Sequence, residues 1–205
     1  IPLRLVGSEM CIRDSLTHIL DWAQKQGCLN ALVLTGHMGE QFEGFTHPGM
    51  SVRCIREDSP LGTGGALWNA QEHLEERFIL LWGDDLHPIQ YSELLNTHHT
   101  MGAPVTMCVT ESHEEMNLRH EDGRLLEYDK ISAKPEFNGY EAGTSIVEKS
   151  VVLKHGSDGV WSWEETVYSA LSGKAAVHLD NTPFWDMGTP ERLELLEQFL
   201  KETTL

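Results

Sequence analysis

Two short strings in this chain carry residue types that suit nucleotide chemistry. The first is Gly62-Thr63-Gly64-Gly65, which follows a predicted strand and opens a predicted helix. Glycine has no Cβ, so we expect backbone N–H groups to point outward here and to approach a planar base or a phosphate closely. The spacing is neither G-x-G-x-x-G nor a P-loop, and a tight strand-to-helix connection explains the string equally well when it is taken alone.

The second string is the carboxylate pair Asp84 and Asp85, which follows an apolar run at 78–82. Open α/β folds bind ligands at the carboxyl ends of their strands. Two adjacent acids there suit Mg²⁺, which takes one or two carboxylates and completes its shell with water and substrate phosphates. A helix N-cap or a solvated turn is the alternative. Asp186 alone is a weaker candidate, because an acid at this position also stabilises a turn.

Lysine and histidine add little when each is taken alone. Lys130 could meet a phosphate as a point charge, although an exposed lysine on an edge strand is the simpler interpretation. The eleven histidines show no H-E-x-x-H or zinc-ligand spacing. The four cysteines are widely spaced and contain no C-x-x-C pair. We therefore expect neither a zinc site nor a disulfide framework, and a reducing compartment.

The elements that must position these residues follow an α/β pattern. Apolar runs at 31–35, 78–82 and 105–110 predict buried strands, and they alternate with expected helices at 16–26, 63–74 and 91–99. Such alternation is typical of a parallel sheet covered on both faces. Glu121-Asp122-Gly123 predicts the turn of an antiparallel hairpin. Further predicted elements are helices at 38–45, 163–171 and 189–200 and strands at 51–57, 143–147 and 175–179.

Length and charge bound the class of protein. A chain of 205 residues fits one α/β domain. Its formal net charge of -17 would repel nucleic acid and anionic membranes, while backbone N–H groups, a lysine and a cation can still neutralise a small phosphorylated ligand. No apolar run reaches a membrane span of ~20 residues. We expect a soluble, cytoplasmic protein, with homo-oligomerisation left open.

The first fifteen residues do not fit the pattern that follows. Residues 1–15 show neither helical nor strand periodicity and lack the apolar core of a secretory signal. The string from Leu5 to Ser15 resembles a tract found at the ends of unrelated metagenomic translations, as from a sequencing adapter. We therefore expect 1–15 to be foreign and 16–205 to be a single domain, with an ordinary N-terminal arm as the alternative.

In order along the chain, these strings resemble the sugar-phosphate nucleotidyltransferases, the NDP-sugar pyrophosphorylases that join a sugar 1-phosphate to a nucleoside triphosphate. The resemblance runs from about Leu16 to Leu200. Glu57 with Pro60 to Leu67 is similar to the family's E-x-x-P-L-G-T-[AG]-G-A-L base-binding turn, and Gly83-Asp84 to its metal-binding G-D. The resemblance implies a Rossmann-like fold with a mixed, mainly parallel sheet. It implies nucleotide contacts at Glu57, Leu61, Gly62, Thr63, Gly64, Gly65 and Gly83.

Later strings extend the resemblance to the part of the site that holds the sugar phosphate. Asp129-Lys130 is similar to the family's E-K pair that holds the sugar phosphate, and Glu141-Ala142-Gly143 to its N-A-G that touches the sugar. Trp185 to Thr189 is similar to the W-x-D-x-G-T that supplies a second metal ligand. The resemblance therefore implies catalytic Asp84, Lys130 and Asp186, sugar contacts at Asp129, Glu141 and Gly143, and Mg²⁺ held by Asp84 and Asp186.

Three departures leave the sugar and base open. Asp129 stands for the usual Glu, Glu141 for the usual Asn, and Trp185 lies directly beside Asp186. The lineage that handles mannose or heptose 1-phosphate with GTP is the nearest in pattern.

The larger departure is at the front of the chain. The family begins with a strand, a G-G-x-G-T-R-L loop and a P-K ahead of the helix that Leu16 starts, and residues 1–15 contain none of these. That loop wraps the triphosphate, and its charges act on the phosphates during transfer. We expect transferase activity in the complete parent and none in this chain. The alternatives are a nucleotide-sugar-dependent glycosyltransferase and a non-catalytic nucleotide- or sugar-binding fragment.

Overall fold

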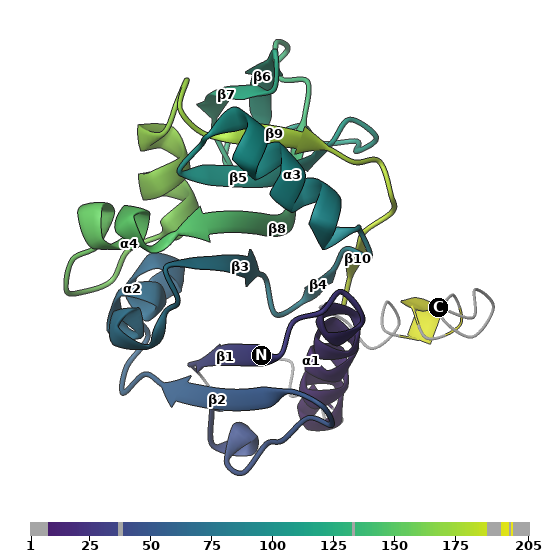
Figure 1. The fold of residues 1–205 in the computed structure, drawn as a ribbon, viewed down its shortest axis with the longest axis vertical. Coiled ribbons are helices and arrows are strands. Elements are labelled where there is room, and N and C mark those ends of the chain that lie inside the picture. Colours follow the sequence, from purple (N-terminus) through teal and green to yellow (C-terminus); the bar gives the residue numbers. More distant parts are fainter. Residues whose placement is uncertain (1–7, 37–38, 133, 188–193, 197, 199–205) are drawn as a thin grey trace, which may run out of the picture.

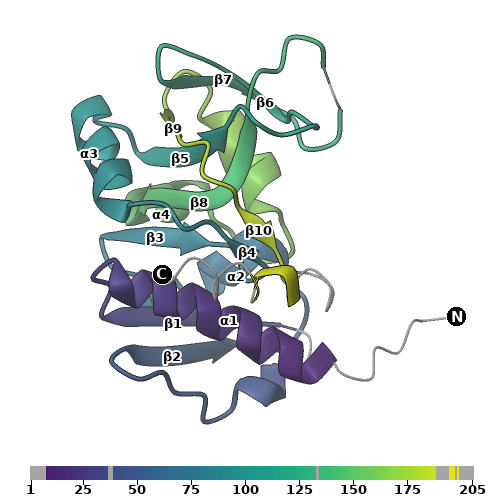
Figure 2. The same ribbon diagram turned by 90° about the vertical axis from the view of Figure 1, so that its right-hand side faces the viewer.

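The chain folds as strands stacked edge to edge with helices against both faces (Figures 1 and 2). The computed structural model describes residues 8–36, 39–132, 134–187, 194–196 and 198. Its strands are β1 (Asn30–Thr35), β2 (Ser51–Arg56), β3 (Arg77–Leu81), β4 (Asp85–Leu86), β5 (Val105–Thr110), β6 (Leu118–Glu121), β7 (Arg124–Tyr128), β8 (Tyr140–Glu148), β9 (Ala176–Leu179) and β10 (Trp185–Asp186).

The helical segments are α-helices, short 3₁₀ segments and a π-helical stretch. The α-helices are α1 (Ser8–Lys25), α2 (Gly62–Asn69), α3 (Tyr91–Met101) and α4 (Lys149–His155). Two 3₁₀ segments lie at Gly39–Phe42 and Gln71–His73, and a π-helical stretch lies at Glu164–Tyr168. α4 was not predicted, and α1 begins at Ser8 although no periodicity was expected before residue 16. Nearly all of the predicted closing helix lies outside the described residues.

The largest sheet has the order β3-β8-β5-β9-β7-β6. β5 and β9 pair in parallel, while β8 runs antiparallel to both β3 and β5. The sheet is therefore mixed, and the Rossmann-like class expected from the sequence is confirmed. The expectation that it is mainly parallel is wrong, because most strand pairs in the described part of the chain are antiparallel. The hairpin is also confirmed, because β6 and β7 pair across a turn in which Asp122 and Gly123 both have positive φ.

Two hydrophobic cores cover the two faces of the sheet. Side chains of α1 and α3 pack on one face together with Cys108 and Ile146. Side chains of α2, α4 and the π-helical stretch pack on the other face with Met107, Val109 and Val147. Successive side chains of a strand point to opposite faces, so β5 and β8 serve both cores. Among the described helices, none combines the length and hydropathy of a membrane span.

Pairing is interrupted between β1 and β3. In the described part of the chain, β1 pairs only with β2 and β3 only with β8, although both views place β1 and β3 next to each other in the stack. Val33 and Ile79 both contribute to the α1 face, and Leu34 and Leu80 to the opposite face. The apolar residues of these strands are nevertheless only half-buried, whereas all of β5 is buried. The full burial predicted for the strand at 78–82 is therefore wrong.

Candidate active site

The turn predicted to bind the base is stabilised by the side chain of Glu57. Glu57 follows β2, and its Oε2 accepts a hydrogen bond from the Leu61 N–H at 3.2 Å. Gly62 then opens α2 with φ of +72°, a left-handed value that glycine adopts without strain. The turn thus enters the helix at the position predicted from the sequence.

A loop of the same chain covers part of this turn. The N–H groups of Gly64 and Gly65 both donate to the carbonyl of Trp161, at 3.0 and 3.4 Å. A Cβ on Gly64 would lie 2.0 Å from the Trp161 ring, so the glycine permits this close packing. The expectation that these two N–H groups point outward is therefore wrong. Gly62 and Thr63 are exposed.

The candidate metal ligands lie on two hydrogen-bonded segments. Gly83 and Asp84 form an exposed turn after β3. β4 and β10 pair antiparallel with Asp85 opposite Asp186, and the Met187 N–H donates to the Asp84 carbonyl at 2.6 Å. The fold therefore brings the two strings together.

The chemistry of these donors fits magnesium. Among the described residues, no cluster of three or more His, Cys, Asp or Glu forms a complete metal cage. Mg²⁺ needs only one or two carboxylates, and water and phosphate oxygens complete its shell. Residues 188–190, the end of the matched string, lie outside the described residues.

The predicted phosphate lysine is paired with a carboxylate that the sequence did not single out. Lys130 follows β7, and its Nζ donates to Oε1 of Glu164 at 2.7 Å. The Lys130 side chain is 59% exposed, whereas that of Glu164 is 6% exposed. The hydrogen bond from Lys130 to Glu164 raises the pKa of Lys130, so its ammonium stays charged beside the solvent.

Asp129 is occupied by its own turn. Its Oδ1 accepts hydrogen bonds from the N–H groups of Ile131 and Ser132, both at 3.0 Å. The N–H groups of Ser132 and Ile131 hold the pKa of Asp129 below its usual range. One oxygen of the residue expected at the sugar therefore stabilises the loop that carries Lys130.

Glu141 is a buried acid near the start of β8. Its Oε1 accepts from the Gly143 N–H at 3.1 Å and its Oε2 from the Trp82 indole N–H at 3.4 Å. Burial raises the pKa of Glu141 to about 8, and the nearby acid Asp85 adds to the rise. Glu141 is therefore mainly a neutral carboxylic acid at pH 7.

Gly143 lets Asp85 approach this acid closely. Its φ is +73°, and a Cβ there would lie 3.0 Å from the Asp85 Oδ2. Gly143, which is predicted to contact the sugar, therefore lies directly against Asp85.

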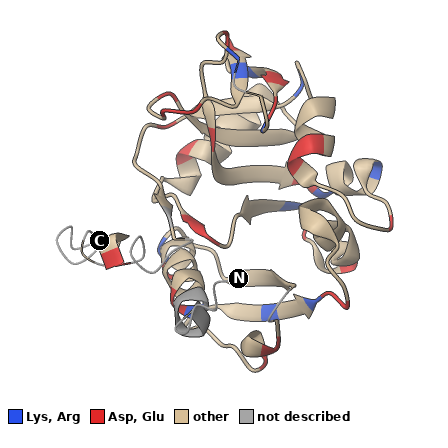
Figure 3. Ribbon diagram, turned by 180° about the vertical axis from the view of Figure 1, so that it is seen from behind, with Lys and Arg blue, Asp and Glu red and all other residues tan. Residues whose placement is uncertain are grey.

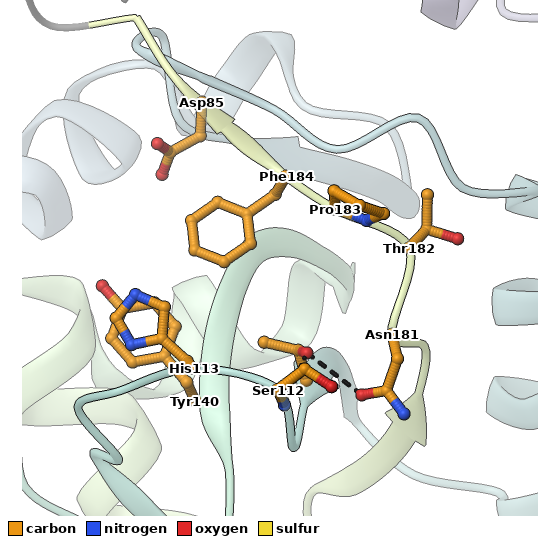
Figure 4. A pocket seen from close by; sticks show the side chains of 9 residues that line it. Asp85, Ser112, His113, Tyr140, Asn181, Thr182, Pro183 and Phe184 are labelled. Atoms are coloured by element: carbon orange, nitrogen blue, oxygen red, sulfur yellow. Dashed lines mark hydrogen bonds between the residues drawn. The ribbon is translucent and has the colours of Figure 1, made fainter.

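A cavity of about 430 Å³ opens beside Asp85 (Figure 4). Three aromatic rings lie nearly parallel in its wall. The centroids of His113 and Tyr140 are 3.8 Å apart, and those of Tyr140 and Phe184 are 5.7 Å apart with planes 8° from parallel. Asn181 accepts a hydrogen bond from the Thr110 hydroxyl at 3.1 Å. The remaining wall is formed by Ser112, Thr182 and Pro183.

The acidic excess is spread over many elements rather than gathered on one (Figure 3). At the predicted site, the acids Asp84, Asp85 and Glu164 and the mainly protonated Glu141 accompany Lys130. A cation would therefore be needed to bring several phosphate groups here.

Comparison with known proteins gives the same class of protein. No family model matches the chain. A bifunctional IPC transferase and DIPP synthase from Rubrobacter xylanophilus is 28% identical over 82% of this chain and 41% of its own length. A mannose-1-phosphate guanylyltransferase from Mycobacterium tuberculosis is 25% identical over 86% of this chain and 53% of its own length. The chain thus spans about half the length of these curated relatives.

A shorter relative is matched over more of its length. The D-glycero-alpha-D-manno-heptose 1-phosphate guanylyltransferase of Aneurinibacillus thermoaerophilus is 24% identical over 86% of this chain and 80% of its own length. Among solved structures, HddC from Yersinia pseudotuberculosis superposes with a TM-score of 0.75 at 20% identity, over 90% of this chain and 84% of its own.

The fold is Rossmann-like and matches that of solved structures in this class. The chain is similar over most of its length to proteins named as sugar-phosphate nucleotidyltransferases, in agreement with the resemblance of its ordered strings.

Proposed function

We propose that the complete parent of this chain transfers a nucleotidyl group from a nucleoside triphosphate to a sugar 1-phosphate. An oxygen of the sugar phosphate attacks the α-phosphorus, and the bond from that phosphorus to the β-phosphate oxygen breaks, releasing pyrophosphate. The attacking phosphate is already ionised, so no general base is required. The observation that carries the proposal is the link from the base turn through Glu164 to Lys130, in a chain whose relatives are named for this chemistry.

Each named residue has one task in this scheme. The turn from Gly62 to Gly65 seats the base, and Lys130 anchors the sugar phosphate as a point charge. Asp84 and Asp186 would hold Mg²⁺, which would neutralise phosphate charge as it develops. Gly143 and the protonated Glu141 form the neutral wall beside the acceptor.

The cavity beside Asp85 supplies a place for the acceptor sugar. Sugar rings present apolar faces and hydroxyl edges. The flat faces of His113, Tyr140 and Phe184 suit the former, and Asn181 and Asp85 suit the latter. Two of the relatives are guanylyltransferases of mannose and heptose phosphates, so we propose GTP and one of these sugars.

We also propose that residues 1–15 are foreign to the domain, because they contain no loop of the kind that wraps the triphosphate in the family that the chain resembles. The interrupted pairing between β1 and β3 supports this, because one further strand there would complete the sheet ahead of α1. A chain without the loop should bind its sugar phosphate but turn over poorly.

The test is a pyrophosphate assay. The 205-residue chain is mixed with GTP, mannose 1-phosphate and Mg²⁺, and product is assayed as pyrophosphate and as NDP-sugar. We expect no robust release. Robust release would contradict the need for the missing loop. Consumption of ready-made GDP-mannose instead would identify a glycosyltransferase and overturn the proposed reaction.

A further inference from the structure

The carboxylate of Glu164 touches both halves of the proposed site. Its Oε1 accepts from Lys130 Nζ at 2.7 Å, and its Oε2 accepts from the Thr63 hydroxyl at 2.8 Å. The Ser162 hydroxyl donates to the same Oε2 at 3.2 Å. Thr63 belongs to the base turn and Lys130 to the phosphate side, so one side chain bridges two segments far apart in the sequence.

This carboxylate is ionised although it is buried. Burial opposes the charge, but hydrogen bonds from Lys130 and Thr63 outweigh it and hold the pKa of Glu164 below its usual range. A buried charge is kept only where partners satisfy it. Loss of either partner therefore disturbs the contact with the other.

The local backbone is adapted to point this side chain inward. Glu164 begins the π-helical stretch Glu164–Tyr168, and such single turns are rare and frequent at functional sites. The next residue, Glu165, is exposed. Two adjacent acids are thus placed in opposite environments.

The Thr63 hydroxyl is fixed from both sides. It donates to Glu164 and accepts from the Trp163 N–H at 2.9 Å. A movement of the base turn at Thr63 therefore acts directly on the residue that holds Lys130.

We propose that Glu164 is a positioning residue that couples the base turn to the phosphate lysine, so that occupation of one subsite orders the other. This inference rests on the proposed function for the identity of the two ligands. Glu164 touches neither ligand and acts through Thr63 and Lys130.

The test asks whether Thr63 influences a phosphate that it does not contact. Binding of mannose 1-phosphate is measured calorimetrically for Thr63→Val in the natural background and in a Glu164→Gln background. We expect Thr63→Val to weaken binding several-fold when Glu164 is present and to have no further effect in the E164Q background. Thr63→Ser, which keeps the hydroxyl, should retain natural binding. Equal effects of Thr63→Val in both backgrounds would overturn the proposal.

A second readout needs no ligand. The unfolding equilibrium is measured by denaturant titration for Thr63→Val, Lys130→Met and their combination, again in both backgrounds. We expect the effects of the two substitutions on the unfolding equilibrium constant to be non-additive when Glu164 is present and additive in the E164Q background. Additive effects in both backgrounds would refute the coupling. A coupled network without mannose 1-phosphate binding would instead count against the proposed function.

Glu165→Gln is the matched control. It removes the same charge one residue along from an exposed side chain. It should leave both readouts unchanged, and an effect equal to that of Glu164→Gln would show a general charge effect rather than coupling.

Discussion

At the scale of single residues, the site depends on acids held in different charge states. Glu164 is kept ionised by Lys130 and Thr63, whereas Glu141 is kept mainly protonated by burial and by Asp85. Environment, not residue type, decides which acid carries charge. Glu141, which stands where the family that the chain resembles usually has Asn, therefore presents a neutral group.

The protonation of Glu141 makes stability depend on pH. Burial raises its pKa from 4.5 to about 8, so the folded state binds the proton more tightly than the unfolded chain. This stabilising contribution is complete below about pH 4.5 and is lost as the pH rises through about 8. Glu141→Gln should remove that loss, and its stability relative to the natural chain should rise by a few kcal/mol between about pH 5 and 9.

Denaturant titrations at several pH values check this prediction. Parallel pH curves for the two proteins would contradict it. Glu165→Gln, which alters an exposed acid, serves as the control and should follow the natural chain.

Sequence alone located the residues whose neighbours are local. Gly62 to Gly65, Asp84 and Lys130 lie at element ends that periodicity predicts. Glu164 could not be found in this way, because its partners Thr63 and Lys130 are brought to it only by folding. The aromatic wall of the cavity escaped for the same reason, since it joins β8, the loop after β5 and the segment before β10.

At the scale of elements, the glycine-rich turn that we propose binds the base is also a packing surface. The Trp161 loop rests on Gly64 and Gly65 and takes their N–H groups. The sequence predicted the turn but not the loop that packs on it, because residues 157–161 have no periodic pattern of their own.

This packing can be tested by adding one methyl group. Gly64→Ala would place a Cβ 2.0 Å from the Trp161 ring. We therefore expect a loss of roughly 1–3 kcal/mol of stability from overpacking. Gly83→Ala is the matched control, because a Cβ on Gly83 would meet nothing within 4 Å. Equal stability of the two variants, measured by denaturant titration, would show that the loop does not pack as described.

At the scale of the whole molecule, the pairing of strands is interrupted between β1 and β3 in the described structure. β1 and β3 carry matching apolar patterns on both faces but pair with other strands in the described structure. The sequence predicted both strands as buried. It could not show their partial exposure, which depends on what lies between them.

Hydrogen exchange should report this interruption. Edge strands open more easily than strands paired on both sides, so amides of β1 and β3 should exchange roughly tenfold faster than those of β5 and β8. Mass spectrometry of peptides from the four strands measures this directly. Equal protection would indicate that the interrupted edges are closed.

The most direct test of the proposed nucleotidyl transfer uses a chain to which a triphosphate loop is added. Residues 16–205 are preceded by a strand, a G-G-x-G-T-R-L loop and a P-K in place of residues 1–15, and pyrophosphate release from GTP and mannose 1-phosphate is followed with and without Mg²⁺. We expect Mg²⁺-dependent release that Asp84→Asn abolishes. Near-normal release from the Asp84→Asn variant would contradict the assignment of the metal site and of the reaction.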